Sequence, residues 1–224
     1  MRTFKLRGLM FAGLLGMSLS TQATAQMWGG DEHIPSLVIA PTEIDIDVPM
    51  PISSGNLELM LAQASRGGGL AELKQQAVRS YTQHLHSELA RELQQYLEDE
   101  EVPLVARDGV LSLHKSLNLK VIKHLSAMKP KGDYDLEQGN VRLTGEFRYT
   151  LKNQQGTALR EQGVNIDELK IEQKYRVRSY HDGRAANDNT EEAIREALSE
   201  LVEELVEAME DTLEADELQE MASL

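Results

Sequence analysis

The sequence predicts an α+β fold, a two-layer sandwich in which two long amphipathic helices cover one face of an antiparallel sheet of about five or six strands. Three observations lead to this prediction. Two segments, 70–98 and 189–213, repeat apolar residues every three or four positions, which is the period of a helix with one buried side. The segments between them alternate apolar and polar residues, as strands with one wet face do. Amphipathic helices and a sheet with one solvent-exposed face bury their apolar surfaces by packing together.

Residues 1–25 have the three parts of a secretory signal peptide. Basic residues come first, an apolar run over 8–19 follows, and Ala23-Thr24-Ala25 supplies small residues for cleavage. The apolar run is shorter than the about 20 residues that span a bilayer, and no later stretch is apolar enough to do so. We therefore expect cleavage after Ala25, export to the bacterial periplasm and no membrane insertion afterwards. Residues 26–35 are expected to form a flexible leader.

Composition limits what the exported chain can bind. The chain has 224 residues, no cysteine and a net charge of −14, and loss of three basic residues with the signal peptide takes this charge to −17. Such a charge argues against nucleic acid and against anionic lipid surfaces. The length favours one α+β domain, placed at 36–218, with a frayed tail at 219–224.

The first strand and the first long helix follow the leader. Residues 43–48 read Glu-Ile-Asp-Ile-Asp-Val, so the apolar side chains share one face and the three carboxylates the other. Residues 49–56 are typical of a turn. Glycines at 67–69 weaken any earlier helix, because each costs about 1 kcal/mol in a helix. The long helix is therefore predicted from Leu70 to about Glu98.

The middle of the chain is predicted to be strands. Leucines and Val121 share one parity over 111–121, and apolar residues share one parity over 141–151. Asn153-Gln154-Gln155-Gly156 then turns the chain into a hairpin. A further strand is predicted to point Ile171, Tyr175 and Val177 inward and to present a basic ladder outward, made of Lys170, Lys174, Arg176 and Arg178.

The last helix is predicted to begin at the N-cap Asn189, with Glu192 three residues later completing a capping box. Between Thr190 and Glu220 the chain carries thirteen carboxylates and one basic residue, Arg195. Like charges four residues apart oppose a helix by about 0.2–0.5 kcal/mol per pair. Burial of the apolar seam outweighs this, because each large aliphatic side chain contributes about 1.5–3 kcal/mol.

Three sources of positive charge are considered for this acidic helix. The first lies within the chain, in the basic zone 103–132 or the ladder 170–178, and we expect it to cover the helix in part. Divalent cations are the second. A basic partner protein is the third, and it would contact Glu203, Glu207, Glu210, Asp211 and Glu214.

No motif in the sequence specifies a reaction. There is no cysteine, no nucleophile elbow and no phosphate loop, so no catalytic residue and no cofactor are predicted. His84 and Glu88, four residues apart on a helix, fall short of a zinc signature. We therefore expect a soluble accessory protein of the envelope that binds a protein partner through the acidic helix and the basic ladder. The alternative is a periplasmic protein that binds divalent metal through His84, Glu88 and the acidic helix.

Overall fold

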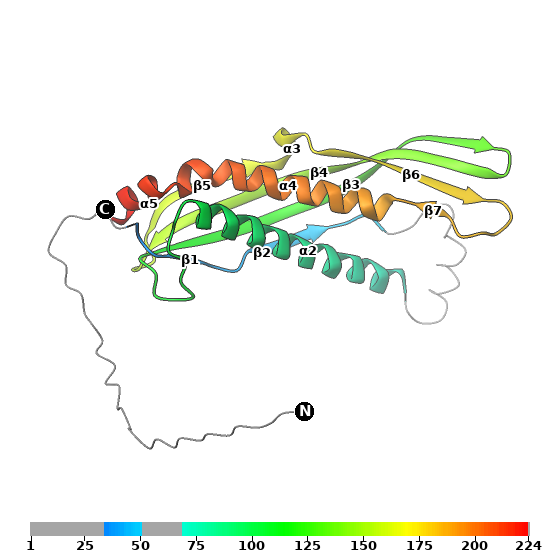
Figure 1. Cartoon of the computed structure of the whole chain (residues 1–224). Coiled ribbons are helices and arrows are strands. Elements are labelled where there is room, and N and C mark those ends of the chain that lie inside the picture. Colours follow the sequence, from blue (N-terminus) through cyan, green and yellow to red (C-terminus); the bar gives the residue numbers. More distant parts are fainter. Residues whose placement is uncertain (1–33, 51–68, 224) are drawn as a thin grey trace, which may run out of the picture. The chain divides into compact units, whose positions relative to one another are not determined.

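The computed structural model describes residues 34–50 and 69–223. The expected signal peptide, most of the expected leader and residues 51–68 lie outside this part of the chain. Figure 1 shows the two layers, a sheet on one side and the helices α2 (Leu70–Asp99) and α4 (Thr190–Leu213) on the other. The predicted sandwich class and both long helices are therefore confirmed. None of the described helices is long and apolar enough to cross a membrane.

The sheet is mixed and has seven strands among the described residues. The strands are β1 (Leu37–Ile39), β2 (Glu43–Asp47), β3 (Leu111–Lys131), β4 (Tyr134–Asn153), β5 (Ala158–Asn165), β6 (Glu172–Tyr180) and β7 (Asn187–Asp188). β3 and β4 form a long antiparallel hairpin. β4 pairs on its other side with β5 and β6, and β6 pairs with β7.

The expectation of a purely antiparallel sheet was wrong for β1 and β2, which pair parallel to β3. The helix α2 lies between β2 and β3 in the chain and returns it to the end of the sheet where β2 began. β2 and β3, which lie on either side of this crossover helix in the chain, then run in the same direction. Alternation of apolar and polar residues indicates which side chains are buried but not the direction of a strand. The sequence pattern therefore could not predict the parallel pairing of β1 and β2 with β3.

The core lies between the sheet and the helices. On the sheet side, Leu111, Leu113, Leu143 and Leu151 are at most 1% exposed, as their shared parity predicts. On the helix side, α2 buries a residue every four positions, at Tyr81, Leu85, Leu89, Leu93 and Leu97. α4 buries apolar residues at the predicted intervals of three and four from Ile194 to Leu213, whereas Ala208, which fits the same spacing, is exposed.

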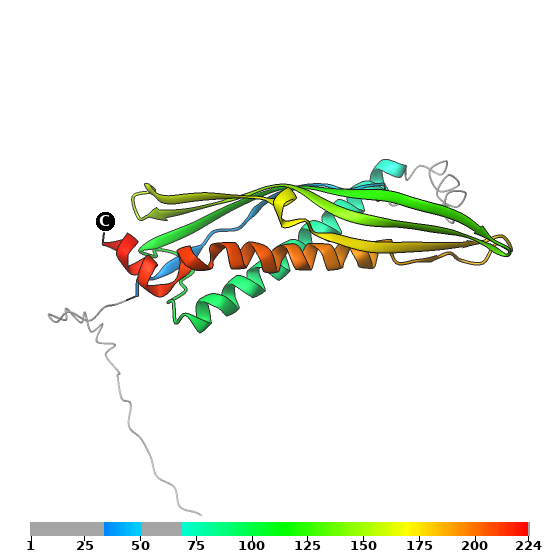
Figure 2. The same cartoon turned by 90° about the horizontal axis from the view of Figure 1, so that it is seen from above.

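The β3–β4 hairpin and β6 continue past the first turns of α2 and α4, as Figure 2 shows. Within this extension the β3–β4 register shifts between Leu125 and Ala127. A bulge of this kind inserts one residue, so side chains beyond it change faces. Lys129 and Lys131 consequently pair with Leu136 and Tyr134 and lie on the face of the sheet that points away from the helices.

The strand predicted at 170–178 begins later than expected. Residues 166–169 form the short helix α3 (Ile166–Leu169), and Lys170 caps its C-terminus in the left-handed conformation, with φ of 56°. β6 starts at Glu172, and from there the prediction is confirmed, since Tyr175 and Val177 are buried and Lys174, Arg176 and Arg178 are exposed.

The ends of the last helix also differ in detail. Asn189 is the N-cap, but its side chain accepts a hydrogen bond from the backbone N–H of Arg176 at 2.7 Å, and the predicted capping box does not form. The Asp188 carboxylate accepts from the N–H of Thr190 instead, at 2.8 Å. Beyond α4, α5 (Ala215–Ala222) occupies most of the expected frayed tail. It is anchored by the buried side chains of Leu218 and Met221.

Candidate functional site: two oppositely charged surfaces

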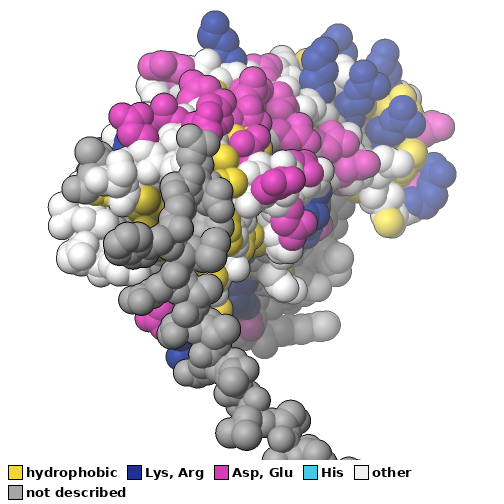
Figure 3. Space-filling model, turned by 60° about the vertical axis from the view of Figure 1, so that its left-hand side comes forward, with side chains coloured by type: hydrophobic (Ala, Val, Ile, Leu, Met, Phe, Trp, Pro, Cys, Tyr) yellow, Lys and Arg dark blue, Asp and Glu magenta, His cyan; other side chains and the backbone are white. Residues whose placement is uncertain are grey.

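The carboxylates of α4 form one continuous surface, here called the acidic face. At 3.6 residues per turn, these side chains leave the helix within an arc of roughly 120°. Figure 3 shows Asp and Glu side chains gathered in a band. The acidic face consists of Glu192, Glu196, Glu200, Glu203, Glu204, Glu207, Glu210, Asp211 and the C-cap Glu214.

The expectation that the basic zone 103–132 or the basic ladder covers the last helix in part was wrong for its acidic face. Among the described residues, the ion pairs of α4 and α5 are Arg195–Glu191 at 3.0 Å and Arg160–Glu217 at 3.1 Å, and neither involves the acidic face. The closest polar contact of the face is neutral, from the Gln173 amide to the Glu200 carboxylate at 2.7 Å. The acidic face therefore keeps its charge without a cationic partner in the described structure.

Within the described chain, the charged groups of the two basic segments form no ion pair with the acidic face. In the zone 103–132, Lys115 is buried and donates to the carbonyl of Ala40 at 3.0 Å. Lys123 pairs with the buried Glu137 at 2.8 Å and lies 4.5 Å from the centre of the Tyr175 ring. The exposed residues of β6 point away from the helix layer, because their neighbours Tyr175 and Val177 point into it.

A groove between α2 and α4 extends the acidic face. Its volume is about 440 Å³, and α2 contributes Glu92, Gln95, Tyr96 and Asp99, whereas α4 contributes Glu203, Val206, Glu207 and Glu210. The Tyr96 hydroxyl donates to the carbonyl of Glu210 at 3.1 Å. Burial and the nearby carboxylates of Glu100, Glu210, Glu214 and Asp211 raise the pKa of Tyr96 to about 12. Burial is the largest cause of this shift, and the carboxylates add to it because they disfavour the negatively charged tyrosinate.

Sequence patterns did not identify the α2 wall of this groove. Glu92 and Asp99 belong to a helix surface of mixed sign, which reads as an ordinary solvated face. Only the packing of α2 against α4 places them beside Glu203 and Glu207.

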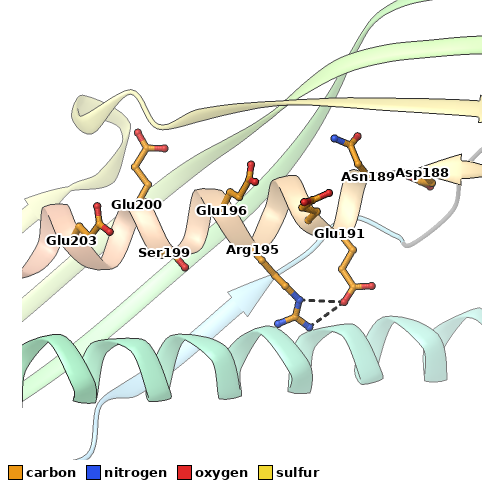
Figure 4. A pocket seen from close by; sticks show the side chains of 9 residues that line it. Asp188, Asn189, Glu191, Arg195, Glu196, Ser199, Glu200 and Glu203 are labelled. Carbon is orange, nitrogen blue, oxygen red and sulfur yellow. Dashed lines mark hydrogen bonds and ion pairs between the residues drawn. The ribbon is translucent and has the colours of Figure 1, made fainter.

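A shallower hollow of about 740 Å³ lies at the N-terminal end of α4. Figure 4 shows Arg195 and Glu191 pointing toward α2, and Glu196 and Glu200 pointing away from it. Among the described residues that line this hollow, Arg195 is the only basic one. Its guanidinium is held by Glu191, by the Ser80 hydroxyl at 2.8 Å and over the Tyr81 ring. Arg195 therefore joins the two helices and leaves the outer carboxylates unneutralised.

A second surface, here called the basic face, lies on the outer side of the extension. It consists of Lys129, Lys131, Lys174, Arg176 and Arg178, all of them exposed. Strand register places Lys129 and Arg178 on either side of Leu136, and none of the five residues forms an ion pair within the described chain. Figure 3 shows a group of Lys and Arg side chains apart from the acidic band.

Aromatic rings accompany these charges. Arg178 lies 5.8 Å from the centre of the Tyr134 ring, and the Tyr134 and Tyr180 rings are 5.9 Å apart. The structure thus brings together three of the four predicted ladder residues and adds Lys129 and Lys131. The fourth, Lys170, lies outside the strand as the cap of α3.

The described residues do not assemble the metal site of the alternative hypothesis. His84 contacts the Ser199 hydroxyl at 3.2 Å, and Glu88 pairs with Arg91 at 2.9 Å. No group of three or more histidines and carboxylates lies close enough to hold an ion within residues 34–50 and 69–223. The Ser199–His84 contact has the geometry of a nucleophile and a base, but no described contact of His84 orients the second ring nitrogen. It is a polar bridge between α2 and α4.

Comparison with known proteins gives a family and a fold. Residues 70–209, from the first residue of α2 nearly to the end of α4, match the family model LptE, described as lipopolysaccharide-assembly. No curated protein sequence matches the chain. The crystal structure of a neuraminyllactose-binding hemagglutinin homologue from Helicobacter pylori is similar, with a TM-score of 0.54 and 12% identity. The match covers 88% of this chain and 96% of that one, and it shows a shared fold.

Two lipoprotein structures are similar at lower scores. A minor lipoprotein from Acinetobacter baumannii has a TM-score of 0.29 at 12% identity, over 80% of this chain and 94% of that one. Lipoprotein GNA1162 from Neisseria meningitidis has a TM-score of 0.19 at 12% identity, over 79% of this chain and 98% of that one.

Proposed function

The chain belongs to the LptE lipopolysaccharide-assembly family, and from this premise we propose that it is an exported accessory protein of the bacterial envelope that acts by binding a protein partner. In this proposal the chain is periplasmic, is released from its signal peptide and catalyses no reaction. The partner belongs to the lipopolysaccharide-assembly machinery that the family name describes.

The observation that carries this proposal is the acidic face without a cationic partner. Repeated i,i+4 carboxylates oppose the helix that bears them, and nothing in the described chain neutralises them. A basic protein surface would relieve that repulsion. Complementary charge also speeds encounter and selects the partner more than it adds affinity. In this proposal Glu203, Glu207 and Glu210, which line the groove with α2, make the central contacts, and Asp211 and Glu214 lie at the rim.

The basic face is proposed as the second contact surface. Arginine and tyrosine are enriched at the energetic centres of protein interfaces, and this face combines Arg176 and Arg178 with Tyr134 and Tyr180. In this proposal Lys174 extends the contact. Lys170, which sequence reasoning placed in the same ladder, contributes least because it lies outside β6.

The proposal is tested by capture from envelope extracts with the full-length exported chain. Glu203→Lys/Glu207→Lys reverses two groove charges, neither of which has a described hydrogen-bond or ion-pair partner. We expect partner recovery to fall at least about tenfold, since reversal replaces attraction by repulsion at two contacts of about 1 kcal/mol or more each. Glu72→Lys/Glu161→Lys changes the net charge equally at exposed positions outside both faces and is the matched control. Equal recovery with the groove variant and the control would overturn the proposal.

A further inference from the structure

We propose that the basic face of one copy of this chain docks on the acidic face of a second copy, so that the chain self-associates head to tail. This inference rests on the two contact surfaces of the proposed function and names one partner for them. Three features of the structure support it: the placement of the two faces, the spacing of their charges and the position of the extension.

The two faces cannot neutralise each other within one chain. Lys174, Arg176 and Arg178 leave the sheet on the side opposite the helices, whereas α4 packs on the inner side against Tyr175 and Val177. The sheet itself therefore separates the charges, and no ion pair joins the two faces in the described chain. A second copy can bring its basic face to α4 without crossing a sheet.

The β3 bulge concentrates the positive charge on one side. Without the register shift between Leu125 and Ala127, Lys129 and Lys131 would share the inward parity of Val121 and Lys123. With it, both lysines lie on the same side of the extension as Arg176 and Arg178. The bulge thus turns a three-residue ladder into a five-residue basic face.

The charges of the two faces have similar spacing. Alternate residues of a strand are about 6.7 Å apart, so Lys174, Arg176 and Arg178 are spaced at that interval. Residues four apart on a helix are about 6 Å apart along its axis, which is the interval of Glu203, Glu207 and Asp211. Over three charges the mismatch grows to only about 1.4 Å, which flexible lysine, arginine and glutamate side chains absorb. A β6 ladder laid along this row of residues, which is inclined to the axis of α4, therefore pairs its charges one to one.

The extension is accessible to such a partner. Figure 2 shows β3, β4 and β6 reaching beyond the first turns of both helices. The net charge of −14 repels two copies at long range. Salt screens charges beyond about 8–10 Å at physiological ionic strength, so only the contacting faces decide close association. Because the two faces differ, the contact is heterologous and continues from copy to copy unless a ring closes.

Sedimentation velocity of the purified full chain tests the inference. We expect concentration-dependent association from the low-micromolar range upward at about 50 mM NaCl, weakened at least tenfold at about 500 mM because both faces are exposed and screened. Arg176→Glu/Arg178→Glu alone and Glu203→Lys/Glu207→Lys alone should each remain monomeric. An equimolar mixture of the two should associate again, because the intact basic face of one variant meets the intact acidic face of the other. Recovery in the mixture also shows that both variants fold.

Arg79→Glu/Arg107→Glu is the matched control, because it reverses two charges of the same sign at exposed positions outside both faces, and it should associate like the wild type. A wild type that stays monomeric at submillimolar concentration and low salt would overturn the inference. So would either charge-reversed variant that associates as strongly as the wild type, or a mixture that stays monomeric. A monomeric chain that still captures an envelope protein through Glu203 and Glu207 would overturn the self-association alone and leave the proposed function in place.

Discussion

Lys115 shows how one residue can depart from the charge pattern around it. In the sequence it belongs to a basic zone expected to cover the acidic helix. In the structure it is 5% exposed, and its ammonium donates to the carbonyl of Ala40 at the break between β1 and β2. Burial lowers the pKa of the Lys115 ammonium from its usual 10.5 to about 8. The charged form is therefore the one that folding disfavours.

This pKa shift predicts how stability depends on pH. Between pH 8 and 10.5 the unfolded chain binds a proton at Lys115 that the folded chain has released, so the free energy of unfolding rises with pH there. Lys115→Met should remove this rise and stabilise the protein at pH 7 by about 1–3 kcal/mol. Urea unfolding at pH 7 to 9.5 measures both effects. A destabilised Lys115→Met protein at pH 7 would show that the bond to Ala40 outweighs the burial cost.

At the scale of elements, the two sides of the helix α4 have opposite effects on its stability. Its inner side buries Leu198, Leu201, Leu205 and Met209 completely. Its outer side carries nine carboxylates, whose mutual repulsion destabilises the helix. The Tyr149 hydroxyl, within 3.1 Å of Thr212 and 2.7 Å of Gln162, ties the end of the helix to β4 and β5. Burial of the apolar side stabilises the helix by more than the repulsion destabilises it, and this burial holds the acidic face in place.

Substitution on each side of α4 tests this balance. Leu205→Ala should cost about 2–5 kcal/mol, because Leu205 is fully buried and truncation leaves a cavity. Glu207→Ala should change stability by less than about 0.5 kcal/mol, in the stabilising direction, because it removes like-charge neighbours. Equilibrium denaturation gives both values. If Leu205→Ala cost no more than Glu207→Ala, the apolar seam would not be what holds the helix.

Over the whole molecule, the net negative charge is large and the charged residues are unevenly distributed. The net charge is −14, with the anionic surplus along α4 and five unpaired cations on the described part of the extension. The repulsion along α4 acts among many exposed carboxylates. Any salt screens such a repulsion, so no specific ion is required.

Thermal unfolding can separate screening from metal binding. The Tm should rise by a few degrees as NaCl increases from low to physiological concentration, because salt screens the repulsion among the carboxylates. CaCl2 or ZnCl2 at the same ionic strength should add nothing, since His84 and Glu88 are engaged with Ser199 and Arg91. A saturable extra rise with either ion would contradict this and restore the metal-binding hypothesis.

Much of the fold could be predicted because burial leaves a periodic trace. The parity of Leu111–Val121 and of Val141–Leu151, and the spacing of Leu85, Leu89 and Leu93, identify which faces are buried. The acidic residues of α4 could be chosen as candidates for the same reason, because identifying the buried side of an amphipathic helix also identifies its exposed side. Strand direction, the bulge after Leu125 and the helix α3 leave no such trace, because each depends on pairing between distant segments.

The sequence by itself determined the sandwich class, the two long helices and the single sign of charge along the last one, because these follow from local periodicity and composition. Tertiary structure alone decided that Glu92 and Asp99 join that charge, that Lys115 is buried and Lys123 pairs with Glu137, and that Lys129 and Lys131 join Arg176 and Arg178. The physical reason is that a surface is made by segments distant in the chain. Which of them become neighbours is fixed by packing and strand register, and neither can be read from one segment alone.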